Sequence, residues 1–322
     1  MADTVIGLEV TQDAVLAAEV RPARRRAVLH RHGRIELPAN AAHDSEVVDS
    51  AVVTDAIRQL WKTARLPRRA KVVLGMDSWR VLVRDFSSPL TSLPRVLESL
   101  PFEVKDLLPV PVEQAAMDFV PTRIDDEGTH GLLVVAGAQS VDDLVRAVDA
   151  AGIRVDAVDL VGLALSRLAG EIAAPEETVA MIRIGRRTTV MSIAVDGVPQ
   201  FVRMLPADID LTAPALAAPG TRAERARSAH ATNADLDDLA VRLRGTLDYY
   251  TGRSDSPSVH RVLVCGAATQ HGSLIPALSD ALRLPVERIE PTSFVNMRRH
   301  AIDPALAQDL VGTMALALGG AR

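Results

Sequence analysis

The chain has 322 residues, of which 48% are hydrophobic and 24% are charged, a composition typical of a globular protein long enough for two domains. Its net charge of −5 disfavours nucleic acid as the main partner. A single cysteine, Cys265, excludes an intrachain disulfide framework and fits the cytoplasm. The N-terminus has no basic start and Glu9 interrupts its apolar run, so we expect no signal peptide. We also expect no bilayer-spanning segment in the chain.

The first quarter of the chain predicts a meander of strands, then a helix and a buried strand. The apolar residues of Ser50–Thr63 recur on one helical face, and Lys71–Gly75 is a short apolar run. The three strands of the meander are expected at Val5–Val10, Ala14–Val20 and Val28–Leu37. These elements together indicate one mixed sheet.

A second unit of strands and helices follows the first. A helix at Val141–Ala151 is expected to have Ser140 as its N-cap. The elements before and after it are predicted at Trp79–Phe86 (strand), Leu93–Leu108 (helix), Gln114–Pro121 and Gly131–Gly137 (strands), and Arg154–Asp159 (strand).

The rest of the chain also alternates strands with helices. Three strands are expected within Thr178–Arg203, whereas Ala207–Ala234 has no clear pattern. The other elements are predicted at Leu160–Ile172 and Asp235–Tyr250 (helices), Val259–Cys265 (strand), Leu274–Leu282 (helix), Val286–Ile289 (strand) and Pro304–Leu318 (helix). Because both halves also open with an antiparallel meander, the sequence predicts a mixed α/β fold with helices on the sheet faces.

The two meanders form a faint internal repeat. Ile6–Glu19 and Met181–Val195 each contain a strand, a polar turn and a returning strand. When the two segments are aligned, Glu9 of the first corresponds to Arg183 of the second, and Ala14 corresponds to Thr188. Two copies facing across a cleft would direct both turns toward one ligand.

The second turn has the composition of a phosphate site with one departure. Gly185, followed by Thr188 and Thr189, could hold a phosphate through backbone N–H groups and hydroxyls. In a nucleotide-hydrolysing protein an acid just before the glycine holds a metal, and here that position is Arg183. A guanidinium can pair with a phosphate but cannot activate water as a metal does.

Two halves that each open with a phosphate turn are the plan of the actin-like ATPase (ribonuclease H-like) fold. Within that superfamily the chain resembles the PilM family, cytoplasmic FtsA-like proteins of type IV pilus assembly. The order and spacing of short motifs carry the resemblance: the opening Gly7–Val20, the distinctive box Leu100–Glu113 with Asp118, and the segments Ala151–Asp159 and Leu247–Tyr250. It implies two pseudo-repeated halves with mixed sheets and an inserted FtsA-type subdomain.

The resemblance also implies a division of the chain. The first half would comprise residues 1–77, with residues 157–177 and 303–322 returning to it. Residues 78–156 would form the inserted subdomain, and residues 178–302 the second half.

The resemblance further implies a partner, the N-terminal cytoplasmic tail of PilN, a membrane protein with one transmembrane helix. The tail would lie in a cleft of the first half and link the chain to the other inner-membrane proteins of pilus assembly. The protein would then be a cytoplasmic scaffold rather than an enzyme, peripheral at the membrane through its partner, with no direct membrane insertion and no nucleic acid bound. Candidate partner-binding residues lie in and after the distinctive box: Phe102, Glu103, Pro109, Val110 and Asp118. These residues could equally be ordinary surface and packing positions, with the proline only ending a helix.

A nucleotide site between the halves is the other implication, and this chain departs from its pattern. Arg183 replaces an acid, Ala207-Asp208 stands where relatives carry two glycines, and Arg227 replaces a lysine. The candidate nucleotide-binding residues are Thr11, Gln12, Arg183, Gly185, Thr188, Thr189, Glu224, Arg227 and Gly266. We therefore expect binding of ATP to be weak or lost, with little dependence on Mg²⁺, and hydrolysis to be absent.

Two alternative functions stay open from the sequence. A nucleotide-dependent enzyme of the same fold, an ATPase or a sugar-kinase-like phosphotransferase, would need a catalytic aspartate and an intact second turn. An FtsA-like filament-forming protein would need a C-terminal amphipathic membrane helix, which Leu318–Arg322 does not provide. The histidines show no metal-ligand spacing, and Cys265 at the end of an apolar strand is expected in the core.

Overall fold

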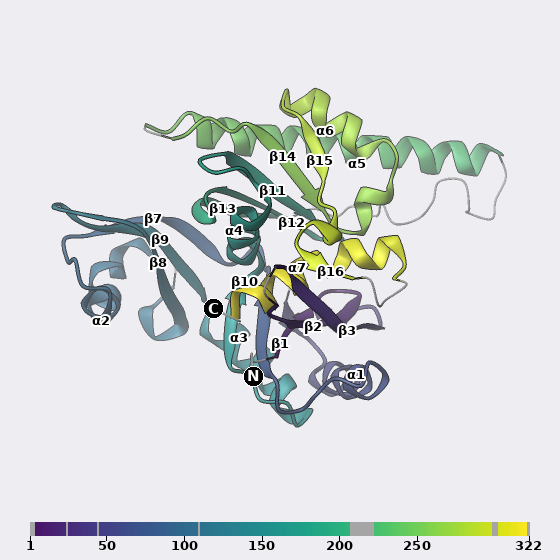
Figure 1. Cartoon of the computed structure of the whole chain (residues 1–322), viewed down its shortest axis with the longest axis horizontal. Coiled ribbons are helices and arrows are strands. Elements are labelled where there is room, and N and C mark those ends of the chain that lie inside the picture. Colours follow the sequence, from purple (N-terminus) through teal and green to yellow (C-terminus); the bar gives the residue numbers. More distant parts are fainter. Residues whose placement is uncertain are drawn as a thin grey trace.

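The structure, a computed structural model, describes residues 4–23, 25–43, 45–108, 110–206, 222–254, 256–297 and 302–320, with the backbone alone for 222–233. Three predicted positions, Pro109, Ala207 and Asp208, lie outside the described residues, as do the side chains of Glu224 and Arg227. Figure 1 shows two large sheets, one above the other, and a smaller sheet to one side.

The lower large sheet is built from the N-terminal part of the chain. Its strand order is β10-β6-β1-β2-β3-β16, with β1–β3 antiparallel and β6 and β10 parallel to β1. The strands are β1 (Val5–Val10), β2 (Ala14–Arg21), β3 (Ala27–Glu36), β6 (Lys71–Met76), β10 (Ala157–Leu160) and β16 (Val295–Asn296), the last of which comes from the C-terminal part of the chain. Every residue of β1 is buried, so both faces of this strand are covered.

The upper large sheet repeats this topology. Its order is β13-β12-β11-β14-β15, which corresponds strand by strand to β3-β2-β1-β6-β10. The strands are β11 (Thr178–Ile184), β12 (Thr188–Val195), β13 (Val198–Pro206), β14 (Arg261–Cys265) and β15 (Val286–Arg288). Glu9 pairs with Leu16 and Gly75, and Arg183 pairs with Val190 and Cys265, so the two residues hold equivalent places. The predicted internal repeat is confirmed.

Two helices lie between the large sheets. Helices α4 (Val161–Ile172) and α7 (Pro304–Gly320) pack on each other, and their apolar side chains share one core with strands of both sheets. Gly7 permits the close approach of α7 to β1, because a Cβ there would lie 1.9 Å from the Thr313 carbonyl oxygen.

The outer face of each large sheet is covered by helices. Helices α5 (Arg222–Thr251) and α6 (Leu274–Leu282) cover the upper sheet, where Leu239, Leu243 and Leu278 join its core (Figure 1). Helix α1 (Ser50–Thr63) covers the lower sheet, and Asp49 caps it by accepting the Val52 N–H at 3.1 Å. No helix within the described ranges is long and apolar enough to cross a membrane.

A three-stranded sheet with one helix lies to the side. Its order is β7-β9-β8, with β7 at Leu82–Ser88, β8 at Ala115–Asp125 and β9 at Gly128–Gly137. Helix α2 (Leu93–Glu103) packs on one face through Val96 and Leu100. The predicted helix to Leu108 is wrong at its end, because the chain tightens into a 3₁₀ turn in which the Leu107 N–H bonds to the Val104 carbonyl at 2.8 Å.

Helix α3 (Ala138–Ala150) starts directly after β9, at a cap residue, Gly137, that offers no side-chain hydrogen bond. Ser140 is therefore not the N-cap, and that prediction is wrong. The buried residues Leu144, Ala147 and Val148 pack in the core that contains α1. Helix α3 thus ties the predicted insertion, residues 78–156, to the lower sheet.

Candidate functional site

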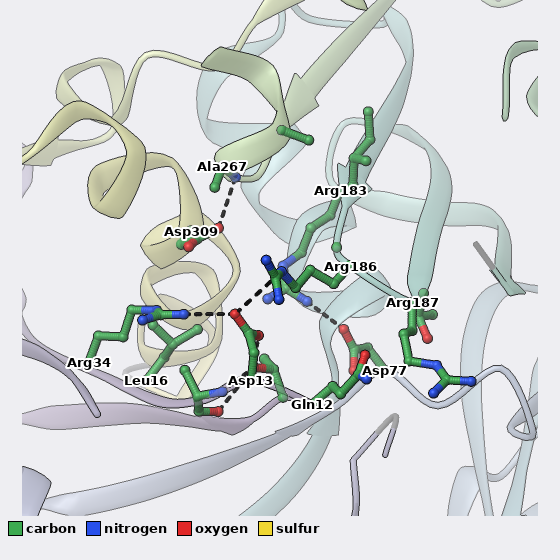
Figure 2. A pocket seen from close by; sticks show the side chains of 16 residues that line it. Gln12, Asp13, Leu16, Arg34, Asp77, Arg183, Arg186, Arg187, Ala267 and Asp309 are labelled. Carbon is green, nitrogen blue, oxygen red and sulfur yellow. Dashed lines mark hydrogen bonds and ion pairs between the residues drawn. The ribbon is translucent and has the colours of Figure 1, made fainter. Parts of the chain in front are cut away.

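The turn between β1 and β2 (the first turn) and the equivalent turn between β11 and β12 (the second turn) meet at one small cavity between the large sheets. Its volume is ≈ 60 Å³, and both turns, Asp77, Arg34, Asp309 and the start of the 3₁₀ turn η3 (Ala267–Gln270) line it (Figure 2). Of the predicted nucleotide-binding residues, the structure brings five to this cavity: Thr11, Gln12, Arg183, Gly185 and Thr188.

The first turn is closed on itself. The Thr11 N–H donates to the Ala14 carbonyl at 2.9 Å, and the Thr11 hydroxyl lies 3.0 Å from both that carbonyl and an Asp13 carboxylate oxygen. Asp13 also pairs with Arg34 at 2.7 Å and lies 3.8 Å from Arg186. The hydroxyl proton is therefore engaged within the turn, and the Asp13 carboxylate itself lines the cavity.

The second turn has the predicted backbone but only one of its two hydroxyls. The Gly185 N–H bonds to the Thr188 carbonyl at 3.1 Å, and a Cβ on Gly185 would lie 2.7 Å from that oxygen, so glycine is required. Thr188 lines the cavity, whereas Thr189 is fully buried and its hydroxyl has no hydrogen-bond partner among the described residues. Successive side chains of a strand point to opposite faces, and Thr189 faces the core.

Arg183 forms a buried ion-pair triad with two carboxylates of the other half. Its guanidinium lies 2.9 Å from a carboxylate oxygen of Glu9 and also pairs with Asp77, which follows β6 (Figure 2 shows the Asp77 pair). All three side chains are less than 10% exposed. We call these three residues the Arg183 triad. It ties the upper sheet to the lower one across the cavity.

Neighbouring hydroxyls complete the hydrogen bonding of the triad. Thr313 of α7 donates to Glu9 at 2.6 Å, and Ser45 donates to Asp77 at 3.0 Å while accepting the Asp77 N–H at 3.1 Å. Burial alone would lower the pKa of Arg183, but Glu9 and Asp77 outweigh it and raise that pKa, so the guanidinium stays charged. Burial raises the pKa of Glu9, and Arg183 opposes this rise.

A third turn closes the cavity from the side of β14. Gly266 has a φ of 105°, and a Cβ there would lie 2.3 Å from the Ile184 carbonyl oxygen, so the predicted glycine is required by the backbone. Asp309 of α7 accepts the N–H of the next residue, Ala267, at 2.8 Å. Burial raises the pKa of Cys265, just before this turn, to about 12, so its thiol stays protonated.

Replacing Asp309 with asparagine should make the protein's stability less dependent on pH. Burial raises the pKa of Asp309 above its ordinary 3.8, and the Ala267 N–H only partly opposes this, so the native state binds a proton more readily than the unfolded chain. The free-energy contribution of this carboxyl therefore becomes more favourable as pH falls. We expect Asp309→Asn to be more stable than the wild type at pH 7, and the difference to shrink toward pH ~4 in denaturant titrations. A difference that grows as the pH falls would contradict this assignment.

The described residues at this cavity do not fit a Mg²⁺–triphosphate. Carboxylate oxygens are the ligands that Mg²⁺ prefers, and the carboxylates of Glu9 and Asp77 are already paired with Arg183. Cavities that enclose small-molecule ligands usually measure roughly 300–1,000 Å³, against ≈ 60 Å³ here. Within the described ranges, no group of three His, Cys, Asp or Glu side chains could hold a metal ion.

Comparison with known proteins places the chain in a family. The family "Type IV pilus assembly protein PilM" matches residues 7–205. The chain belongs to the PilM family. A solved PilM–PilN type IV pilus biogenesis complex contains a similar chain, with 22% identity, a TM-score of 0.81, and coverage of 100% of this chain and 98% of that one.

Two more distant structures also share the fold of this PilM-family chain. The ethanolamine utilization protein EutJ from Carboxydothermus hydrogenoformans is 13% identical, with a TM-score of 0.54 and coverage of 97% and 88%. A protein of unknown function with an actin-like ATPase fold from Bacteroides thetaiotaomicron is 8% identical, with a TM-score of 0.54 and coverage of 98% and 96%. The predicted actin-like fold is confirmed.

The residues predicted to bind a partner do not gather at one place. Phe102 is 82% exposed at the end of α2, while Glu103 accepts hydrogen bonds from Ser88 and Ser99. Asp118 is exposed on β8, where its carboxylate accepts the Phe119 N–H at 2.8 Å. Val110, another member of this set, lines a groove.

That groove lies at one end of the small sheet, beside the start of α3 and the segment that contains Glu46. Its volume is ≈ 650 Å³. Its lining includes the charged residues Glu46, Arg80, Glu113 and Asp142 and the apolar residues Leu82, Val110 and Val135. We call it the acidic groove. Sequence reasoning missed its acidic residues, which stand on three separate segments of the chain.

Proposed function

We propose that this protein is a non-catalytic scaffold of type IV pilus assembly. It holds the N-terminal cytoplasmic tail of a PilN-like single-span membrane protein in the acidic groove. The family supports the pathway, and the similar solved structure is a PilM–PilN complex. The single observation that carries the choice of groove is its net negative lining.

The charges of the acidic groove suit a basic tail. Arg80 is already paired with Glu46, at 2.9 and 3.1 Å to its two oxygens, which leaves the exposed Glu113 carboxylate without an ionic partner among the described residues. Segments on the cytoplasmic side of membrane spans are enriched in Lys and Arg. Leu82, Val110 and Val135 add apolar contacts for the side chains between such charges. Through this tail the protein would lie in the cytoplasm at the inner face of the membrane.

Reversing the charge of Glu113 should weaken binding of the tail. We expect Glu113→Lys to raise the Kd about tenfold, because a favourable charge contact becomes a repulsive one. The measurement is fluorescence anisotropy with a labelled synthetic peptide of the cytoplasmic tail of a PilN-like single-span protein. Glu127→Lys is a matched control, since Glu127 is exposed in the same small sheet's hairpin and does not line the groove. Equal losses in both variants, or none in either, would contradict the placement.

We propose that ATP binds weakly or not at all and is not hydrolysed. The Arg183 triad supports this, because a cation already neutralises the carboxylates that would otherwise hold Mg²⁺. Calorimetry with ATP, with and without Mg²⁺, should show at most weak binding with little dependence on the metal, and a phosphate-release assay should stay at background. Sub-micromolar, Mg²⁺-dependent binding with turnover would instead support the ATPase alternative.

A further inference from the structure

A second groove of similar size lies at the junction of the small sheet and the upper sheet. Its volume is ≈ 690 Å³, and β7, β13 and the end of α5 contribute its walls. Leu82 lines both this groove and the acidic groove, so the two lie on either side of the start of β7. We call the second one the basic groove. Neither the predicted nucleotide site nor the predicted partner site includes it.

The basic groove lies between two sheet edges. Strand β7 is one of the two edge strands of the three-stranded sheet, and β13 is one of the two edge strands of the five-stranded sheet (Figure 1). No strand in the described part of the chain pairs with the outer edge of either. Such edges pair readily with an added extended segment. The apolar side chains of Leu132, Val202 and Met204 are mostly buried beneath the groove, where they pack between the small sheet and the upper sheet.

The charge of the basic groove is opposite to that of the acidic groove. Arg84 and Arg203 are both exposed and form no ion pair within the described residues. Arg203 lies over the Tyr249 ring, 5.9 Å from its centroid. The one carboxylate in the lining, Asp85, is already paired with Arg253 at 2.7 Å. An occupant must therefore supply negative charge.

Two exposed aromatic rings, those of Trp79 and Tyr249, line the groove. Trp79 is 46% exposed and Tyr249 is 59% exposed, and each has an arginine over its ring. Large aromatic side chains and arginine are the residues that most often dominate binding energy at protein interfaces. Their position beside two open strand edges suits an extended chain whose alternate side chains point into the groove.

We propose that the basic groove binds an acidic, extended peptide segment of a second protein partner. Main-chain groups of the segment would pair with an open edge of β7 or β13. Its carboxylates would pair with Arg84 and Arg203, and its apolar side chains would pack on Trp79 and Tyr249. Because the acidic groove is lined by other residues apart from Leu82, a basic tail and an acidic segment can bind at the same time.

The test uses a synthetic peptide of about eight residues, the length of one strand, in which Glu alternates with Leu. The chain has two tryptophans and Trp61 is only 3% exposed, so a change in tryptophan emission on titration reports on Trp79. We expect saturable binding that weakens as salt is added. Arg84→Glu and Arg203→Glu should each raise the Kd at least about tenfold. A second peptide with Lys in place of Glu should not produce the emission change.

Two controls separate this site from others. Arg95→Glu, a charge reversal at an exposed position of α2 outside the groove, should leave the Kd unchanged. Glu113→Lys in the acidic groove should also leave it unchanged. Absence of binding by the acidic peptide, a preference for the Lys peptide, or equal binding by the wild type and Arg84→Glu would each overturn the proposal. The comparison of the two peptides on the wild type stands even if a variant fails to fold.

Discussion

Replacing Arg183 with leucine should lower the free energy of unfolding by about 3–5 kcal/mol. The change removes the one cation that faces Glu9 and Asp77, and it leaves two buried carboxylates without an ionic partner among the described residues. Both would then have to take up protons or admit water. Urea or thermal unfolding of the two proteins at pH 7 gives the measurement.

Arg183→Lys is the matched control for this prediction. Lysine retains the positive charge but lacks the planar guanidinium that contacts both carboxylates at once. We therefore expect the free energy of unfolding to fall less than for leucine. The difference in stability between Arg183→Leu and the wild type should change little with added salt, because the triad is shielded from the solvent. Exposed ion pairs contribute less than about 1 kcal/mol to the free energy of unfolding. If Arg183→Leu lowered that free energy by no more than this, the triad would be open to water.

The Arg183 triad also shows how the two halves of the repeat complement each other in charge. In the first half the carboxylate of Glu9 stands at the end of β1, and the equivalent place in the second half holds the arginine that pairs with it. The two equivalent positions therefore carry opposite charges, and their side chains neutralise each other across the cavity.

The sequence predicted local elements well where local chemistry decides them. Helix α1 has the predicted bounds because its apolar stripe and its Asp49 cap both lie within the segment. The equivalence of Glu9 and Arg183 also followed from the sequence, since the two meanders repeat the same pattern. Ser140 shows the limit of such signals, because the end of β9 leads directly into α3 and leaves no place for a cap three residues later.

The missed features of the site depend on contacts between distant segments. Arg183 and Asp77 are 106 positions apart in the sequence, and Glu9 and Thr313 are 304 apart, so no local pattern reports either contact. Thr189 is different. Strand alternation alone would have placed it on the face opposite Thr188, and its assignment as a phosphate ligand could have been avoided from the sequence.

Replacing Gly7 with alanine should be among the most destabilising single-methyl changes in this chain. The added Cβ would lie 1.9 Å from the Thr313 carbonyl oxygen and 3.2 Å from the Ala317 nitrogen, both backbone atoms of α7. Relief requires that the helix move away from β1, which opens the core between the sheets and draws Thr313 from Glu9. We expect a loss at or above the usual range of about 1–3 kcal/mol for overpacking.

Gly245→Ala is the matched control for Gly7→Ala, with an effect of the opposite sign. Gly245 is exposed within α5, and a Cβ there meets nothing within 4 Å. Alanine in a helix interior should therefore stabilise the protein by about 0.5–1 kcal/mol. Denaturant unfolding of both variants beside the wild type measures the two effects together. If Gly7→Ala proved as stable as the wild type, α7 could not lie against β1 as closely as the structure has it, and the hydrogen bond from Thr313 to Glu9 would lose its basis.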